Sequence, residues 1–277
     1  KNQYYVSASW YSQDGIVGGN YDRSNYNRFT ARVNDKYLLF DATEERSWLN
    51  RMAINLNVSY SYTDIKGIDP NNTYGSTLGS AVTLSPILGV YVDPDSEQAV
   101  IDKYSVNENA GTEENPYDKP YNLLRGDNGR LFTVPGSDYN EMFNPVAELT
   151  MDGQYNRYDR IVGGADVEFQ IYDGLTFKSS VGVDLGFRDI GAWTPNYYLT
   201  SVRKAGHSSV WSQMGRQFSW QVENVLTYDN TFDGHHITAM LGQSAFSYRG
   251  KWVQGANQNL VEEDPDRANL GFTTGIP

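Results

Sequence analysis

The sequence contains no cysteine and only three histidines, which are His207, His235 and His236, among 277 residues. Without cysteine the chain can form neither disulfides nor thiolate metal sites. His235 and His236 are adjacent, and neighbouring residues of a strand point to opposite faces, so they make a poor pair of metal ligands. The sequence also lacks the glycine patterns of a P-loop or a Rossmann fold. We therefore expect no metal and no other cofactor.

Positive charge is also scarce. The chain has 22 Lys and Arg against 34 Asp and Glu, which gives a formal net charge of −12. Nucleic-acid-binding proteins usually carry a basic surface, so we expect no nucleic-acid partner. The longest apolar stretch, residues 81–92, is too short for a membrane-spanning helix. A membrane β-barrel remains compatible with this composition, because its strands alternate lipid-facing and lumen-facing residues.

Long runs of strictly alternating apolar and polar residues are what the sequence does contain. In residues 51–64, Met52, Ile54, Leu56 and Val58 alternate with polar or small residues. This period of two indicates a strand with one apolar and one polar face. The run is about twice the usual strand length of roughly five or six residues. Comparable runs occupy residues 3–12, 27–35, 163–173, 175–189, 216–229 and 236–248.

Two features depart from the alternation. Residues 77–85 are the one plausible helix, although Gly79 weakens the prediction. In residues 236–248 the apolar positions change phase, which predicts a β-bulge near Gly242. The sequence therefore predicts about seven strands, one short helix and one irregular strand pair.

The connections between the predicted strands differ greatly in length. Asp173-Gly174 and residues 230–235 are tight turns, whereas residues 65–155 and 190–212 are long. In an antiparallel up-and-down order, both long connections fall at one end and both tight turns at the other. This asymmetry is typical of outer-membrane barrels, and a compact soluble domain rarely carries such long loops. The connection at 36–49 is longer than expected for the tight-turn end.

These patterns predict an all-β fold, namely a segment of an antiparallel up-and-down transmembrane β-barrel with long extracellular loops. A tilted strand needs about 9–11 residues to cross a bilayer, so the apolar face would contact outer-membrane lipid. The polar face would line the lumen, where charged residues form a solute path or contact a plug. Alternatively, the same charges are the solvated face of an ordinary sheet. The predicted lumen-facing residues are Arg28, Arg32, Arg51, Asp166, Glu168, Lys178, Asp184 and Arg188.

Aromatic side chains in the second long loop are candidates for substrate binding. Trp193, Tyr197 and Tyr198 could stack on sugar rings, although loop aromatics are also common packing anchors. No residue is predicted to be catalytic, and the chain is not expected to be an enzyme. Residues 242–246 resemble half of a nucleophile elbow but lack its second glycine and its strand-to-helix context.

Several stretches together resemble SusC/RagA-type TonB-dependent outer-membrane transporters of the Bacteroidetes. They are residues 12–35, Asn144-Pro145, and residues 174–184, 194–198 and 223–246. The resemblance implies a barrel of about 22 strands that a plug domain closes from inside. It also implies import of glycan fragments or peptides, with energy passed from the inner membrane through TonB. A SusD-like lipoprotein would cap the barrel and meet the loops at 65–155 and 190–212.

In that case residues 1–277 are part of the barrel, and the plug and the closing carboxyl-terminal strands lie outside this chain. The expected location is the outer membrane of a Gram-negative, Bacteroidetes-like cell, crossed several times by the chain. The expected partners are a SusD-like surface lipoprotein, the TonB complex, outer-membrane lipid and an oligosaccharide or peptide solute. The alternative is a soluble or surface-exposed β-protein that binds carbohydrate, and it would need no detergent.

Overall fold

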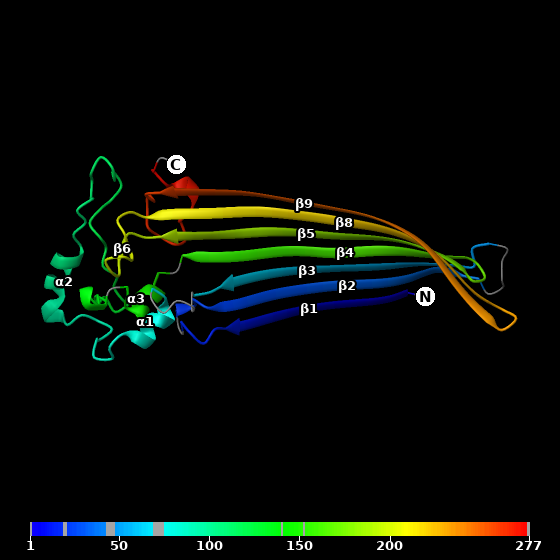
Figure 1. The fold of residues 1–277 in the computed structure, drawn as a ribbon, viewed down its shortest axis with the longest axis horizontal. Helices are drawn as coiled ribbons and strands as arrows, with labels where there is room; N and C mark the ends of the chain where they lie inside the picture. Colours follow the sequence, from blue (N-terminus) through cyan, green and yellow to red (C-terminus); the bar gives the residue numbers. More distant parts are fainter. Residues whose placement is uncertain are drawn as a thin grey trace.

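The computed structural model describes residues 2–18, 21–42, 48–68, 75–139, 141–151 and 153–275. Its main feature is a seven-stranded antiparallel sheet in the order β1-β2-β3-β4-β5-β8-β9, so that strands adjacent in the large sheet follow one another along the chain (Figure 1). This confirms the predicted up-and-down order. The strands are β1 Asn2–Asp14, β2 Asn25–Asp41, β3 Arg51–Lys66, β4 Gln154–Tyr172, β5 Leu175–Thr194, β8 Ser209–Phe232 and β9 His235–Gln258.

The register places most of the aliphatic residues of these strands on one face. Val58 lies opposite Val33 on one side and Gly163 on the other, and Gly163 lies opposite Val183. Residues that lie opposite each other in an antiparallel pair share a face, so the alternation of each strand is continued by its neighbours. This apolar face includes Val6, Phe29, Val33, Leu56, Val58, Ile161, Val167, Val181, Val183, Phe218, Val222 and Leu241. The opposite side is here called the polar face.

The predicted bulge near Gly242 is wrong. The register between β8 and β9 runs without a shift through the pair Val225 and Gly242. The apparent change of phase arises because Phe246 and Tyr248 lie on the polar face. The register shifts that do occur lie elsewhere, between Leu38 and Phe40 and between Gln170 and Tyr172.

Most strands extend well beyond the runs of alternating residues. β8 and β9 have 24 residues each. Their added segments carry polar or aromatic residues on both faces, so periodicity alone does not reveal them. The connection at 36–49 looked long in the sequence because β2 continues to Asp41 and so includes the first part of it. Part of that stretch is strand, which shortens the connection between β2 and β3 to residues 42–50.

The long loops and the tight turns lie at opposite ends of the sheet, as predicted (Figure 1). At the tight-turn end, Gly174 and Gly234 adopt φ values of 71° and 82°, which glycine accepts without strain. In the part of the chain that the structure describes, the other end carries three α-helices, three 3-10 helices and a two-stranded ribbon. They are α1 Thr77–Thr83, α2 Glu97–Tyr104, α3 Pro145–Leu149, η2 Pro94–Ser96, η3 Ser137–Tyr139, η4 Leu270–Phe272, β6 Tyr197–Tyr198 and β7 Lys204–Ala205.

Helix α1 confirms the predicted helix, whereas α2 and α3 were not predicted. Ser76 caps α1 by accepting a hydrogen bond of 3.1 Å from the Gly79 backbone. Asn144 caps α3 in the same way, and Pro145 occupies its first position, where no backbone donor is needed. No helix within the described ranges has the length and apolarity required to cross a bilayer.

The hydrophobic core lies in the loops rather than beneath the sheet. We call the folded part of residues 75–151, 195–208 and 259–275 the loop cap. One cluster in it is built from Phe132, Phe143, Ala147 and Leu199, and a second from Val92, Leu123 and Leu131. Within the described strands of the large sheet, Ala53 and Val210 are the buried hydrophobic residues. A soluble sheet normally buries one face against a second layer, and no described segment supplies one here.

Candidate functional site

The predicted lumen-facing residues share one face of the sheet. Arg28 and Arg188 lie in one cross-strand row, because both are linked by register through Thr63 and Tyr158. The alternation of each strand places the others on the same side, namely Arg32, Arg51, Asp166, Glu168, Lys178 and Asp184. The structure therefore brings all of them to the polar face. That this face lines a lumen remains a prediction.

Ion pairs join neighbouring strands across the polar face. Arg51 Nη1 lies 3.7 Å from Glu168 Oε1, and Lys178 Nζ lies 3.6 Å from Asp166 Oδ2. Asn55 Nδ2 donates a hydrogen bond of 2.6 Å to the same Asp166 oxygen. All these pairs include partly exposed groups, so each contributes no more than about 1 kcal/mol to stability. Their main effect is to fix which direction each charged side chain takes.

Arg160 belongs to the same face and was missed by the sequence analysis. Its Nε donates to Asp184 Oδ1 at 2.9 Å and its Nη2 donates to Asp184 Oδ2 at 2.5 Å. Two parallel bonds of this kind are the strongest arrangement of an arginine and a carboxylate. Residues 154–162 carry polar residues on both faces, so the alternation that identified 163–173 could not extend the strand to Arg160.

A groove crosses the polar face at the end nearer the loop cap. Its volume is about 710 Å³, and it is lined by side chains that include Arg28, Tyr158, Arg188, Tyr248 and Trp252. The Arg188 guanidinium lies 5.1 Å from the centroid of the Tyr158 ring. The groove therefore combines arginine with aromatic surface, which suits a ligand that has both charge and flat apolar faces.

Two of the three aromatic residues predicted to bind substrate, Tyr197 and Tyr198, pack into the loop cap. Tyr197 packs against the cluster around Phe143, and burial raises the pKa of its phenol. Tyr198 belongs to the second cluster, where its ring centroid lies 5.4 Å from those of Tyr104 and Tyr121. Trp193 lies near the end of β5, and its backbone N donates to the Gly153 carbonyl at 2.9 Å. The packing role named as the alternative accounts for Tyr197 and Tyr198, and sugar stacking by the three residues remains a prediction.

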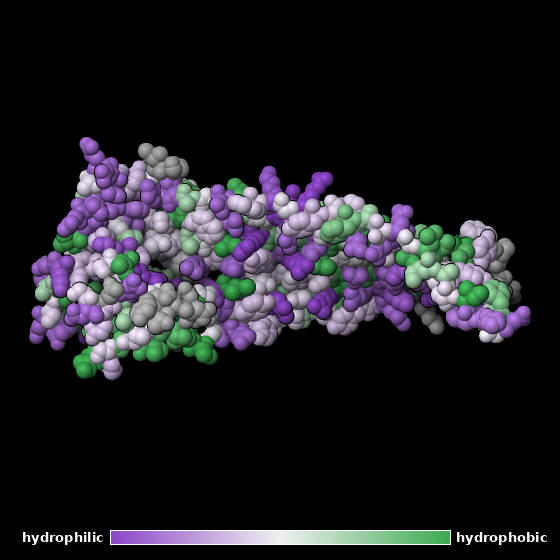
Figure 2. Space-filling model, in the orientation of Figure 1, coloured by the Kyte–Doolittle hydropathy of each residue, from purple (hydrophilic) through white to green (hydrophobic). Residues whose placement is uncertain are grey.

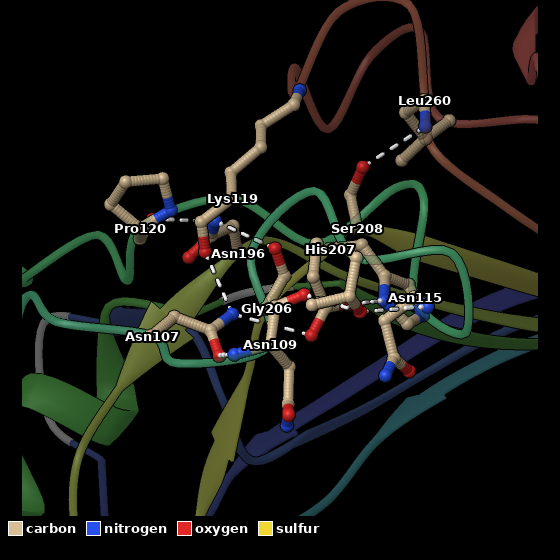
Figure 3. A network of polar contacts seen from close by, with 12 residues as sticks. Asn107, Asn109, Asn115, Lys119, Pro120, Asn196, Gly206, His207, Ser208 and Leu260 are labelled. Carbon is tan, nitrogen blue, oxygen red and sulfur yellow. Dashed lines mark hydrogen bonds and ion pairs between the residues drawn. The ribbon is translucent and has the colours of Figure 1, made fainter.

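Asn196 ties the loops of the cap together (Figure 3). Its side-chain nitrogen donates to the carbonyl oxygens of Pro120 and Gly206, both at 3.0 Å. Its side-chain oxygen accepts from the Asn122 backbone at 2.8 Å, and its backbone N donates to Glu263 at 2.9 Å. The side chain and the backbone N of this one buried residue thereby bond groups from all three segments of the loop cap, which holds them as one folded unit.

A second set of polar contacts extends the network shown in Figure 3. His207 Nδ1 lies 2.6 Å from Asp118 Oδ1, and Asn107 Nδ2 donates to Asp118 Oδ2 at 3.2 Å. Ser208 Oγ accepts from the Leu260 backbone at 2.9 Å. His207 is thus a structural residue of the cap. Across the described ranges, His, Asp and Glu form no group of three or more that could hold a metal ion.

The fold and its two faces define a class of protein. An antiparallel up-and-down sheet with one exposed apolar face, one charged face and a folded loop cap at one end is the arrangement of an outer-membrane-type β-barrel wall. No protein-family model matches the chain. The chain is 24% identical over 274 residues to TonB-dependent receptor P3 of Formosa agariphila. The aligned region covers 97% of this chain and 22% of that protein.

Solved structures show the same fold. The structure of the RagAB peptide transporter superposes on this chain with a TM-score of 0.61 and 17% sequence identity. The match covers 100% of this chain and 26% of the transporter chain. The RagAB peptide importer matches in its 'closed-closed' state with 17% identity and in its 'open-open' state with 16%, both at a TM-score of 0.63. These matches again cover 100% of this chain, and 25% and 26% of those chains.

The comparisons confirm the resemblance to SusC/RagA-type TonB-dependent transporters, and the chain spans about a quarter of the length of these proteins.

Proposed function

We propose that this chain is a wall segment of a TonB-dependent outer-membrane importer of glycan oligosaccharides or peptides. The observation that carries the proposal is the apolar face, which stays exposed along the sheet. Leu241 is 73% exposed and Val181 is 44% exposed, although both are aliphatic. In water such a face would be covered by a second layer, whereas in a bilayer it contacts lipid.

The dimensions of the apolar face support a location in the outer membrane, with several crossings by the chain. Its apolar residues run from 52 to 62 in β3 and from 177 to 187 in β5. A tilted strand needs about 9–11 residues to cross the hydrocarbon, so these stretches match one crossing each. The remaining residues of the long strands would project outside and carry the loop cap there.

Import requires no bond to be made or broken, so the proposed roles are recognition and gating rather than catalysis. The loop cap, with Trp193, Tyr197 and Tyr198, and the polar face would select the solute. A plug domain outside residues 1–277 would gate it, and the TonB complex would supply energy through that part of the protein. Residues 1–277 would then be a partial barrel domain of the whole transporter.

A SusD-like surface lipoprotein is the proposed partner of the loop cap. Support comes from an apolar patch on α1 and the turn after it, where Val82 is 77% exposed and Ile87 is 93% exposed. Figure 2 shows a hydrophobic strip along the lower margin of the end that carries the helices. Exposed apolar patches of this kind mark protein contacts, and this one lies where a lid would rest on the outer loops.

Surface proteolysis tests the membrane topology. Intact cells that carry the full-length parent protein should be cut within residues 108–116 of the loop cap, which are largely exposed. Asp173-Gly174 and Asp233-Gly234 should be protected until the envelope is broken, because they would face the periplasm. Mass spectrometry of the fragments should locate the cuts and show whether they fall only in the loop cap or also in the tight turns. Equal cutting at both ends, or recovery in the soluble fraction, would favour the carbohydrate-binding β-protein.

An uptake assay tests import itself. Cells without the parent protein should fail to accumulate a labelled oligosaccharide or peptide in the periplasm, and the restored full-length protein should recover the accumulation. An uncoupler of the inner membrane should stop accumulation but leave surface binding intact, because binding needs no energy input. Accumulation that persists without the protein, or that an uncoupler does not change, would contradict an energised importer.

A further inference from the structure

A single row of side chains crosses the whole polar face at the groove. We call it the arginine row, and the register defines it with one residue from each strand of the large sheet. It runs through Tyr11, Arg28, Thr63, Tyr158, Arg188, Gly215 and Trp252. Neighbouring strands lie about 4.7–4.9 Å apart, so Arg28 and Arg188 are roughly 14–15 Å apart across the strands. The row therefore presents two guanidinium groups at a fixed spacing, with aromatic rings beside them.

Neither guanidinium group has a carboxylate partner among the residues that the structure describes. Arg28 and Arg188 are both exposed, and no ion pair joins either of them to another described residue. On the same face Arg51 is paired with Glu168 and Lys178 with Asp166, whereas Arg32, like Arg28 and Arg188, forms no ion pair with a described residue. In a chain with net charge −12, unpaired arginines are unexpected on a surface that has no further role.

Positive charge exceeds negative charge around the arginine row, because the groove is lined by four arginines and one lysine against a single carboxylate, Asp159. The row toward the tight-turn end consists of Ser9, Thr30, Ser61, Arg160, Gly186, Gln217 and Gly250. On the cap side, the corresponding positions hold Gln13, Tyr26, Asn156, Ile190, Gln213 and Gln254. On the polar face, Asp184 lies two rows from Arg188 toward the tight-turn end, and it is engaged by Arg160. The groove is thus a local basic site on an acidic protein, which favours anions.

Glycines make room for a ligand beside the arginines. Gly186 and Gly215 flank Arg188 in β5 and β8, and Gly250 lies next to Trp252 along β9. Side chains at these positions would fill the groove, whose volume of about 710 Å³ lies within the usual range of roughly 300–1,000 Å³ for ligand sites. Trp252 is 63% exposed, so its ring is available to a ligand.

The arginine row lies where an incoming solute would first meet the wall. In β5 the apolar face ends at Phe187, and Arg188 follows it toward the loop cap. In β3 the apolar face ends at Tyr62, and Thr63 of the row follows it. The row is therefore just outside the stretch that would be embedded in lipid, on the cap side.

We propose, on the basis of the proposed import function, that the arginine row binds the carboxylates of an acidic oligomer and that the imported solute is therefore anionic. Arginine binds carboxylate through two parallel hydrogen bonds, and its planar group also stacks on rings. An extended peptide rises about 3.3–3.6 Å per residue, so four residues span the separation of Arg28 and Arg188. Short chains of sugar acids and acidic peptides share this carboxylate chemistry.

Binding measurements on the purified full-length protein test this proposal. The labelled ligands are a galacturonate hexamer, a glutamate hexamer and neutral maltohexaose. A hydrogen bond to a charged group is worth about 1.5–3 kcal/mol, so Arg188→Gln alone should weaken the binding of an acidic hexamer about 10–100-fold. The Arg28→Gln/Arg188→Gln variant should weaken it by more than that. Which acidic hexamer responds distinguishes a sugar-acid solute from a peptide. Arg188→Lys keeps the charge but loses the bidentate geometry, and it should fall between wild type and Arg188→Gln.

Arg249→Gln is the matched control, because Arg249 is an exposed arginine opposite Phe218 on the other face of the sheet. It should change affinity less than about twofold. The proposal is overturned if neither acidic hexamer binds the wild type, if the neutral hexamer binds best, or if the double variant binds acidic hexamers as well as wild type. None of these outcomes alters the surface-proteolysis pattern, whereas failure of the proposed function does, so the two failures are distinguishable.

Discussion

Replacing Val181 by arginine should abolish most of the folded, membrane-inserted protein, whereas arginine at the adjacent Ser180 should be tolerated. Val181 lies on the apolar face between Ala165 and Val222, near the middle of the apolar stretch of β5. An arginine at the midplane of a barrel's lipid-facing surface costs about 2–4 kcal/mol. That loss is a large fraction of the roughly 5–15 kcal/mol that holds a typical protein folded.

Ser180→Arg is the control, because Ser180 is adjacent to Val181 in the sequence but lies on the opposite face of the sheet. It lies opposite Asp166 and Glu223 on the polar face, so an arginine there would stand between two carboxylates. Refolding of each full-length variant into lipid vesicles, followed by urea titration, would give the free energy of unfolding. Equal losses for both variants would mean that neither face meets lipid. A larger loss for Ser180→Arg would place lipid on the polar face instead.

The sheet could be predicted from the sequence because its two environments act on every strand. A strand with one apolar and one polar side must alternate apolar and polar residues along its sequence. The sequences around Val58 and Val181 show this alternation. The alternation ends where both sides of a strand are polar. The alternating pattern therefore could not identify the extensions of β8 and β9 as strand. Phe246 and Tyr248 misled the prediction because large aromatics occupy the polar face there. Their position follows from the register with β8, which no local pattern encodes.

The loop cap could not be predicted, because its order depends on contacts between distant residues. Helix α3 has five residues, which is too few for a helical period to be recognised. Asn196 is fixed by groups from residues 120, 122, 206 and 263, which meet only in the folded cap. The arginine row has the same character. Each member is an exposed or half-buried residue with no local motif around it, and only the register aligns them.

Replacing Glu148 by alanine should open the loop cap while leaving the sheet folded. Glu148 is 8% exposed, accepts from Arg203 Nη2 through Oε1 and accepts from Thr77 Oγ1 through Oε2. Arg203 also lies over the Phe143 ring at 4.4 Å and donates to the Gly75 carbonyl. The pair therefore connects the ribbon of β6 and β7 with α1 and α3. Its loss would leave a guanidinium partly buried against an aromatic core without its counterion.

Breaking a buried pair costs about 3–5 kcal/mol, and the side chain of Arg203 is one-third exposed, so we expect about 2–4 kcal/mol. Hydrogen exchange on the full-length protein should show faster exchange over residues 75–151 and unchanged exchange in β3, β4 and β5. Glu97→Ala is the control. It breaks the exposed Arg125–Glu97 pair of the same cap, which measures 2.6 Å, and should change exchange little.

The variant Glu148→Gln/Arg203→Met tests the cause of that effect. If the cap opens because an unpaired cation is left in a low-dielectric site, removing both charges should restore much of the protection that Glu148→Ala removes. If the carboxylate acts mainly through Thr77 and the end of α3, the double variant should exchange as fast as Glu148→Ala. Unchanged exchange in both variants would show that the apolar clusters around Phe143 and Leu131 hold the cap without the pair. The first result would make Arg203 and Glu148 the electrostatic connection between the loops, and it would explain how a cap without disulfides keeps one arrangement above the barrel wall.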